Sequence, residues 1–420
     1  MPKPKNKQSP GRHIDTRLVH GTERESWPDG ATLPPVVYSS AFAYETAGEM
    51  EEVFSGRREG MVYSRLANPT VGDLEKRVTQ ACGARGAVAM SSGAAAIAMS
   101  LLALAKSGDE LIASRLLFGG TYTLFTKTLA DLGVKVHLVD PSDPAAAESL
   151  VGPATRAVFL EAIANPSMSV PDIHAWRKFC DSHGLALVLD ATLLTPYLFN
   201  PEQVPADVAV FSASKYLAGA ASVIGGLVLD TGRMDWVGNR RLSFAELRPE
   251  GEKAYLARLR KRLLFDCGAS LSPMNAFLMM VGMESLGLRL ERQCATSLEI
   301  ARFLESRPQV RQVNYPGLPG SPSYELCRAQ YALPGSLLSF RLADKAACFR
   351  FLDALELVQR VTNLGDTRTL ALHPASTIYA SFWKHEQEEA GVTEDLIRLS
   401  VGIEHSGDII SDLEQALNAI

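Results

Sequence analysis

The feature that most constrains the fold is a regular alternation, between residues 84 and 230, of short apolar runs with longer helix-like stretches. This alternation is typical of an α/β domain built on a mainly parallel sheet. Ligands bind such sheets at the carboxyl ends of the strands, so the residues that directly follow each run are candidates for a site. The runs are Ala87–Met90, Glu110–Ala113, Val134–Val139, Ala157–Leu160, Leu185–Leu189, Val208–Phe211 and Ile224–Leu229.

The rest of the chain suggests three regions. Residues 1–60 lack clear periodicity, so we expect an N-terminal tail and an extended arm with one helix near Ala47–Phe54. Residues 61–262 form the expected large domain, which closes with a connecting helix over Arg240–Arg262. Residues 263–420 mix helical and strand patterns and predict a smaller α+β C-terminal domain. Its expected elements include helices at Asn275–Leu290 and Ala295–Arg307 and a strand at Leu337–Leu342.

Composition excludes several classes of function. The net charge of −5 is small for 420 residues, and basic side chains are scattered among acidic ones, so we expect no nucleic-acid partner. No run of about 18 apolar residues occurs, so we expect no membrane span and a cytoplasmic location. The six cysteines lie far apart without the spacing of a zinc site, which favours reduced core thiols and no metal.

Lys215 stands where such a sheet delivers contacts to a ligand. It closes the segment Phe-Ser-Ala-Ser-Lys, which directly follows the apolar run ending at Phe211. The hydroxyls of Ser212 and Ser214 precede it and could donate to a phosphate. Taken alone, a lysine in a loop is more often a surface residue.

Two further positions favour a functional role for Lys215 over a surface position. Asp190 ends another run, and a half-buried carboxylate needs a cationic or hydrogen-bonding partner such as a protonated pyridine nitrogen. The alternative is an Asp that caps a turn or helix. Ser92 and Gly93 open a helix of small residues whose first N–H groups would seat a phosphate, although a plain serine N-cap gives the same pattern. Phosphate seat, acid and lysine together are far more specific than any one of them.

Five segments keep the order and spacing of a known motif set: Tyr63–Thr70, Ser92–Gly93, Asp190–Thr192, Ser212–Lys215 and Arg398–Gly402. They resemble the signature of the Cys/Met-metabolism enzymes that depend on pyridoxal 5'-phosphate and share the aspartate-aminotransferase fold. The resemblance runs from about His13 to the C-terminus. Three more segments resemble the O-acetylhomoserine and O-succinylhomoserine sulfhydrylase branch most: Gly119–Tyr122, Asn363–Leu370 and His373–Thr377.

The resemblance implies a role for each matching residue around the cofactor. Lys215 would bind it as a Schiff base and later move protons, while Asp190 would pair with the pyridine nitrogen. Phe118 would stack on the ring where most members have tyrosine, and phenylalanine cannot transfer a proton. Asn165 would lie near the phenolic oxygen, although it could also only shape a turn before a proline. The phosphate would be held by Ser92, Gly93, Ser212 and Ser214.

Substrate and subunit contacts follow from the same resemblance. Arg398 would clamp the substrate carboxylate through its planar fork, with Asn363 beside it. Tyr63 and Arg65 resemble a pair that reaches the phosphate from the neighbouring subunit, and Tyr63 would also contact the substrate, unless it is plain core. The implied assembly is a homo-oligomer, and the resemblance implies a tetramer made of two dimers.

The expected reaction is γ-replacement on an O-acetyl- or O-succinyl-homoserine by sulfide or a small thiol, giving homocysteine or methionine. A γ-lyase acting on methionine or cystathionine is the nearest alternative. Against it, Gly120 stands where methionine gamma-lyases carry a reactive cysteine. A retired enzyme that serves as a binding protein is a further alternative, which the retained Lys215 and Asp190 disfavour.

Overall fold

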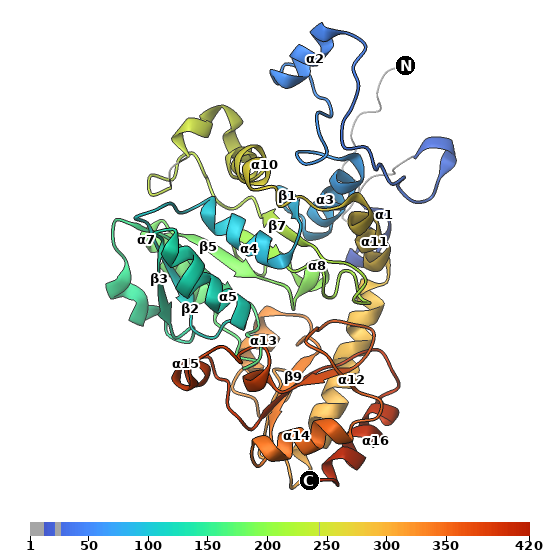
Figure 1. Ribbon diagram of the computed structural model, residues 1–420. Helices are drawn as coiled ribbons and strands as arrows, with labels where there is room; N and C mark the ends of the chain where they lie inside the picture. The colour runs from blue at the N-terminus through green and yellow to red at the C-terminus, as the bar shows by residue number, and fades with distance from the viewer. Residues whose placement is uncertain (1–11, 22–26, 243) are drawn as a thin grey trace.

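The computed structural model describes residues 12–21, 27–242 and 244–420, and it contains two sheets (Figure 1). The tail expected at the start of the chain falls on residues 1–11 and lies outside the described residues. The strands of the larger sheet are β1 Gly86–Met90, β2 Glu110–Ser114, β3 Lys135–Val139, β4 Thr155–Glu161, β5 Ala186–Asp190, β6 Val208–Phe211 and β7 Gly226–Asp230.

Seven strands lie in the order β1-β7-β6-β5-β4-β2-β3. Only β7 is antiparallel to its neighbours, β1 and β6, so the prediction of a mainly parallel sheet is confirmed. Each predicted run became a strand with ends shifted by two residues at most. The carboxyl ends of β1, β4, β5 and β6 therefore meet at one edge of this sheet.

The smaller sheet has the order β10-β11-β12-β9-β8 and is mostly antiparallel, with one parallel pair, β10 and β11. Its strands are β8 Gln312–Asn314, β9 Leu337–Arg341, β10 Gln359–Arg360, β11 Leu370–Leu372 and β12 Leu396–Ser400. The longest helix, α12, runs from α11 beside the large sheet towards α16 beside the small one (Figure 1).

Helices cover both sheets (Figure 1). They are α1 Ile14–His20, α2 Ala47–Phe54, α3 Pro69–Cys82, α4 Gly93–Leu102, α5 Gly119–Thr123, α6 Leu129–Asp131, α7 Ile173–His183, α8 Thr195–Leu198, α9 Ala254–Arg258, α10 Phe265–Cys267, α11 Pro273–Glu284, α12 Leu286–Glu305, α13 Tyr324–Gln330, α14 Lys345–Ala354, α15 Lys384–Glu389 and α16 Ser406–Leu417. Shorter 3₁₀ turns are Pro28–Gly30, Pro144–Leu150, Ala245–Lys253 and Pro374–Ser376, and π-turns are Leu124–Thr128 and Leu259–Leu264.

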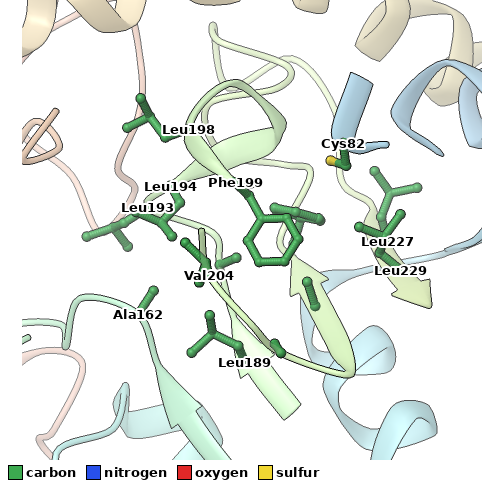
Figure 2. Close-up of a cluster of buried hydrophobic side chains, with 14 of the residues drawn as sticks. Cys82, Ala162, Leu189, Leu193, Leu194, Leu198, Phe199, Val204, Leu227 and Leu229 are labelled. Carbon is green, nitrogen blue, oxygen red and sulfur yellow. The ribbon is translucent and has the colours of Figure 1, made fainter. Parts of the chain in front are cut away.

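The large sheet is buried on both faces, which explains why its strands are continuous apolar runs rather than alternating ones. In β5, Leu187 and Leu189 join one apolar core while Ala186 and Val188 join the core on the other face. Figure 2 shows the first core, where side chains of β5, β7 and α8 and the loop after α8 converge. The rigid sheet holds the ends of its strands in fixed positions.

Two helix predictions were wrong in their limits. The connecting helix expected over Arg240–Arg262 is a 3₁₀ segment from Ala245 followed by short helical turns. Pro249 lacks an N–H group and Gly251 has φ 54°, so no continuous helix can pass through them. In the next region the helix break falls at Ser285, before α12, and not between residues 290 and 295.

The N-terminal arm agrees in part with expectation. Helix α2 forms where it was predicted and lies apart from the rest of the molecule (Figure 1), while α1 was not predicted. Of the six cysteines, Cys267 is exposed, so the prediction of core burial is wrong for it. Among the described residues, no helix combines the length and the apolar character needed to cross a membrane.

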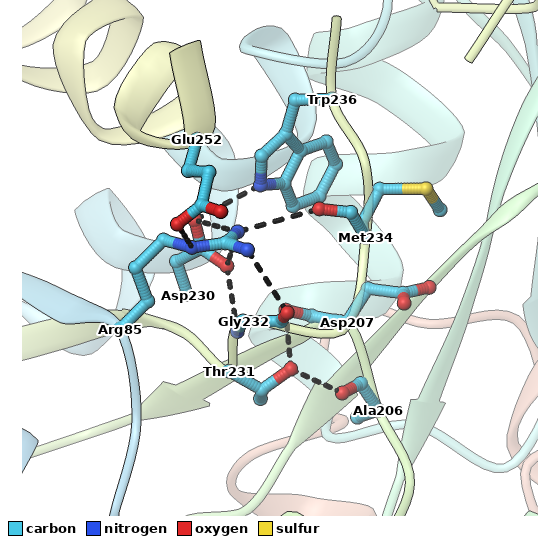
Figure 3. Close-up of polar contacts among 9 residues, drawn as sticks. All are labelled: Arg85, Ala206, Asp207, Asp230, Thr231, Gly232, Met234, Trp236 and Glu252. Carbon is cyan, nitrogen blue, oxygen red and sulfur yellow. Dashed lines mark hydrogen bonds and ion pairs between the residues drawn. The ribbon is translucent and has the colours of Figure 1, made fainter. Parts of the chain in front are cut away.

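A buried carboxylate anchors the far end of β7, opposite the edge that carries the candidate residues. Asp230 accepts hydrogen bonds from Arg85 Nη1 at 3.2 Å, from Trp236 Nε1 at 2.9 Å and from Gly232 N at 3.0 Å. Figure 3 shows these donors converging on the carboxylate. Removing the acceptor would leave the N–H groups of Trp236 and Gly232 without this partner and would take the buried counter-ion from the half-buried Arg85, which keeps its contacts to Met234, Gly232 and Glu252.

We therefore expect Asp230→Ala to lower the free energy of unfolding by about 3 to 5 kcal/mol, the range for breaking a buried ion pair. Thermal and urea unfolding, followed by circular dichroism, measure this loss. Asp131→Ala, an exposed aspartate on α6, is the control and should leave the unfolding midpoint almost unchanged. Equal midpoints for the two variants would contradict the structural role of Asp230.

Candidate active site

One cavity of ≈ 530 Å³ lies at the carboxyl edge of the large sheet and is lined by residues of both sheets and their loops. Of the twelve residues predicted from the sequence, Tyr63 and Arg65 are absent from its lining. The other ten line it: Ser92, Gly93, Phe118, Asn165, Asp190, Ser212, Ser214, Lys215, Asn363 and Arg398. The structure thus gathers residues from widely separated parts of the chain.

Two loops meet on one side of this cavity. Ser92 is the N-cap of α4, where its Oγ accepts from Ala95 N at 3.1 Å. A Cβ atom at Gly93 would lie 2.5 Å from Ser212 Oγ, so only glycine lets the start of α4 approach the end of β6 so closely. The Ser214 Oγ exchanges hydrogen bonds with the backbone of Gly225. Hydroxyls and a helix N-terminus together form an anion seat.

Asp190 ends β5 inside the cavity, with its Oδ1 accepting from Thr192 N at 2.9 Å. Burial raises the pKa of its carboxyl group. Thr192 in turn accepts from Ser212 N through its Oγ1 at 2.8 Å, which ties the ends of β5 and β6 together. Because no cation pairs with Asp190 among the described residues, a protonated ring nitrogen is the partner that its environment favours.

Glu161 is a cavity residue that the sequence analysis missed. It ends β4 in direct register with Asp190 of β5 and is only 6% exposed. Burial, with the charge of Asp190 as a second cause, raises the pKa of its carboxyl group to about 8. The signal was available, since Glu161 follows an apolar run just as Asp190 does.

Lys215, Asn363 and Arg398 form a hydrogen-bonded chain across the cavity. Lys215 Nζ donates to Asn363 Oδ1 at 2.8 Å, and Arg398 Nη2 donates to the carbonyl oxygen of Asn363 at 2.8 Å. Arg398 Nη1 donates to Asn165 Oδ1 at 3.2 Å. Burial lowers the pKa of Lys215 to about 8, with the positive charge of Arg398 as the second cause.

Arg398 is buried, and one of its N–H donors is free to bind an anion. Its Nε has no hydrogen-bond partner among the described residues, and burial lowers its pKa to about 10. A substrate carboxylate would offset the cost of that buried charge and occupy its free donor.

Residues of α11 and α12 hold the loop that carries Lys215 in place. Arg289 donates to the carbonyl oxygen of Tyr216 through Nη1 at 2.8 Å. A Cβ at Gly282 would lie 2.2 Å from the carbonyl oxygen of Leu217, so the helix packs directly on this backbone. The position of Lys215 therefore depends on residues far away in sequence.

Tyr63 and Arg65 lie in the segment that precedes α3. Tyr63 is 43% exposed, and the Arg65 guanidinium stacks on the ring of Phe265 and donates to the carbonyl oxygen of the same residue. Within one chain, neither side chain reaches the cavity.

The cavity fits a phosphorylated pyridine aldehyde on three observations. Its lining includes serine hydroxyls beside a helix N-terminus, a half-buried acid with a raised pKa and a lysine with a lowered pKa. A mainly parallel sheet with this site defines the class of α/β enzymes that bind pyridoxal phosphate through a lysine.

Comparison with known proteins identifies the family of the chain. Residues 15–418 match the family described as Cys/Met metabolism PLP-dependent enzyme, and the chain belongs to this family. It is 37% identical to the L-methionine gamma-lyase of Pseudomonas putida, over 96% of this chain and 97% of the relative. It is also 37% identical to the O-acetyl-L-homoserine sulfhydrylase of Corynebacterium glutamicum, over 100% of both chains.

A solved structure supports the cofactor as well as the fold. A Campylobacter jejuni protein determined with N'-pyridoxyl-lysine-5'-monophosphate superimposes with a TM-score of 0.93 at 31% identity, covering 97% of this chain and 100% of the other. The protein is therefore a pyridoxal-phosphate-dependent enzyme of amino-acid metabolism.

The lowered pKa of Lys215 makes a prediction for the cofactor-free protein. Only the neutral amine attacks an aldehyde, so a pKa of about 8 means that the rate of cofactor loading rises with pH through that value. Between pH 7 and pH 9 the neutral fraction, and with it the rate, should increase about tenfold. Stopped-flow absorbance of the loading reaction measures this.

Arg398→Gln should move the midpoint upward, because it removes the second cause of the shift, whereas Arg341→Gln, on the edge of the small sheet, should not. A midpoint near the ordinary lysine value of 10.5 in the unmodified protein would contradict the proposed environment of Lys215.

Proposed function

We propose that the protein catalyses γ-replacement on an O-acylhomoserine by sulfide or a small thiol, giving homocysteine or methionine. The observation that carries this choice is Phe118, whose ring lines the cavity but offers no hydroxyl. Relatives of both the sulfhydrylase and the lyase kind are equally similar, so the choice rests on the cavity itself.

The residues around the cavity have separate tasks in this reaction. The cofactor, when bound, supplies an electron sink for charge that develops on the substrate. Lys215 would hold it and then move a proton from the substrate α-carbon, while Asp190 keeps a proton on the ring nitrogen. Arg398 and Asn363 would orient the substrate through its carboxylate, which fixes the bond to be broken. Asn165 would lie against the phenolic oxygen, and the phosphate would be held by Ser92, Gly93, Ser212 and Ser214.

Phe118 favours a leaving group that departs without a proton. An acyl-oxygen leaving group is stable as a carboxylate, whereas a thiolate from methionine or cystathionine benefits from protonation. A phenylalanine ring face contributes stacking but no proton transfer. The acylhomoserine is therefore the better substrate for this cavity.

The charges of the cavity favour the acetyl over the succinyl ester. Among the described residues that line it, Lys215 and Arg398 are the only cations, and the proposed reaction engages both. A succinyl group would bring a second carboxylate for which this chain offers no further cation, at the cost of desolvating it. The remaining lining is largely apolar and includes Ile97, Leu124, Leu193, Val223 and Ile224.

The complete site would include residues of a neighbouring subunit. Tyr63 and Arg65 lie outside the cavity of their own chain, and the Tyr63 side chain is exposed. We infer that they complete the phosphate and substrate sites of a second copy, in an assembly of two dimers. The cytoplasmic location expected from the sequence also stays a prediction.

The purified enzyme should convert O-acetylhomoserine with sulfide faster than O-succinylhomoserine, and either ester faster than it cleaves methionine or cystathionine. Chromatographic analysis of products from parallel incubations ranks these rates. Phe118→Tyr should raise thioether cleavage relative to acylhomoserine replacement by about tenfold or more, because it restores a proton donor. If the unmodified enzyme cleaves methionine faster than it converts any acylhomoserine, the lyase replaces the proposed function.

Subunit sharing predicts complementation between inactive variants. Arg65→Ala and Lys215→Ala should each abolish most activity, and mixed oligomers of the two should recover part of it, since some interfaces then hold one intact site. Differential tags allow the mixed species to be purified and assayed. Absence of recovery in verified mixed oligomers would mean that one chain builds the whole site.

A further inference from the structure

Glu161 is a buried carboxylate that lines the cavity but has no task in the proposed chemistry. Its two oxygens accept from two different backbone groups. Phe118 N donates to Oε1 at 2.6 Å, and Asn165 N donates to Oε2 at 3.0 Å. Glu161 therefore joins two loops that border the same cavity.

Each of these loops carries a residue with a proposed role. Phe118 follows β2 and begins α5, where no side chain caps the helix, so Glu161 supplies the acceptor for its N–H. Asn165 lies in the loop after β4, and its side-chain oxygen accepts from Arg398. Glu161 thus contacts both the loop of Phe118 and the loop of Asn165, whose side chain accepts from Arg398.

We propose that Glu161 is a positioning residue that fixes the Phe118 ring relative to Arg398, so that the cofactor ring and the substrate carboxylate are held in one geometry. This inference rests on the proposed roles of Phe118 and Arg398, but not on which reaction follows.

The residue type supports a positioning role. A carboxylate offers two acceptor oxygens, whereas an amide side chain offers one acceptor and one donor, so only a carboxylate can accept from both N–H groups with separate oxygens. Its placement beside Asp190 is costly, because two carboxylates share a buried region. Simple packing between the two loops would need no titratable group here, where burial and the charge of Asp190 raise the pKa of Glu161 to about 8.

The loops have a second link, so the fold does not depend on Glu161 alone. Tyr379 OH donates to the carbonyl oxygen of Leu117, and it also lies 3.4 Å from the carbonyl oxygen of Asn165. A variant at Glu161 should therefore fold, while the two loops lose the hydrogen bonds that fix their relative position.

The test compares Glu161→Gln and Glu161→Asp in the cofactor-loaded enzyme. Glutamine keeps the size but turns a donor towards one N–H group, and aspartate keeps the carboxyl group but is one methylene shorter. Asp207→Asn is the matched control, since Asp207 is a buried carboxylate that also accepts a backbone N–H, from Leu187 at 2.7 Å, at the opposite edge of the sheet.

Visible circular dichroism of the bound cofactor reports the asymmetry of its ring environment and requires no turnover. We expect both Glu161 variants to change this signal while retaining cofactor. We also expect KM for O-acetylhomoserine to rise about tenfold, the effect of a weakened charge-assisted hydrogen bond, with a smaller change in kcat. The control should lower the unfolding midpoint and leave both the signal and KM unchanged.

The proposal would be overturned if both Glu161 variants kept the dichroism and the KM of the unmodified enzyme. It would equally be overturned if they lost only stability, which is the result expected for the control. An altered Glu161→Gln beside an unaltered Glu161→Asp would still support it, since aspartate retains both acceptor oxygens, whereas the reverse pattern would overturn it. If O-acetylhomoserine is not a substrate, the proposed function fails, and the same KM comparison is made with methionine while the dichroism test stands. A Glu161→Gln chain that does not fold leaves Glu161→Asp to decide.

Discussion

A buried arginine joins the two halves of this enzyme. Arg398 lies on β12 of the small sheet, yet it donates to Asn165 from the large sheet's loops and to the backbone of Asn363. No carboxylate is among these partners, so the protein carries the desolvation of a guanidinium without the usual compensation. Such a charge is tolerated where a ligand supplies the missing anion, as the proposed substrate carboxylate would.

The large sheet shows why much of the site was predictable from the sequence. Parallel strands bring their carboxyl ends to one edge, so Asp190 and Lys215 could be placed together from the apolar runs before them. Glu161 follows the same rule but was not predicted, because it belongs to none of the motifs that mark the other site residues. Its contacts are to backbone N–H groups, and no side-chain pattern announces those.

Other features depend on tertiary contacts that local sequence does not encode. The hydrogen bond from Lys215 to Asn363 joins positions in different sheets, and the resemblance to a family suggested Asn363 without this contact. The connecting segment near Pro249 was predicted as a helix from its charged composition, but proline and glycine break it. The break at Ser285 was also not predicted, because no proline or glycine occupies that position in the sequence.

The antiparallel strand β7 has a mechanical consequence for the lysine. Strand β6 ends at Phe211 and β7 begins at Gly226, at the same edge, so both ends of the loop that carries Lys215 are attached to the large sheet. Arg398 and Asn363 are attached to the small sheet and its loops. A small rotation of one sheet against the other would change the separation between amine and guanidinium while the anion seat stays whole. The separation between amine and guanidinium thus depends on the angle between the two sheets, whereas the serines at the start of α4 and after β6 are held by the large sheet alone.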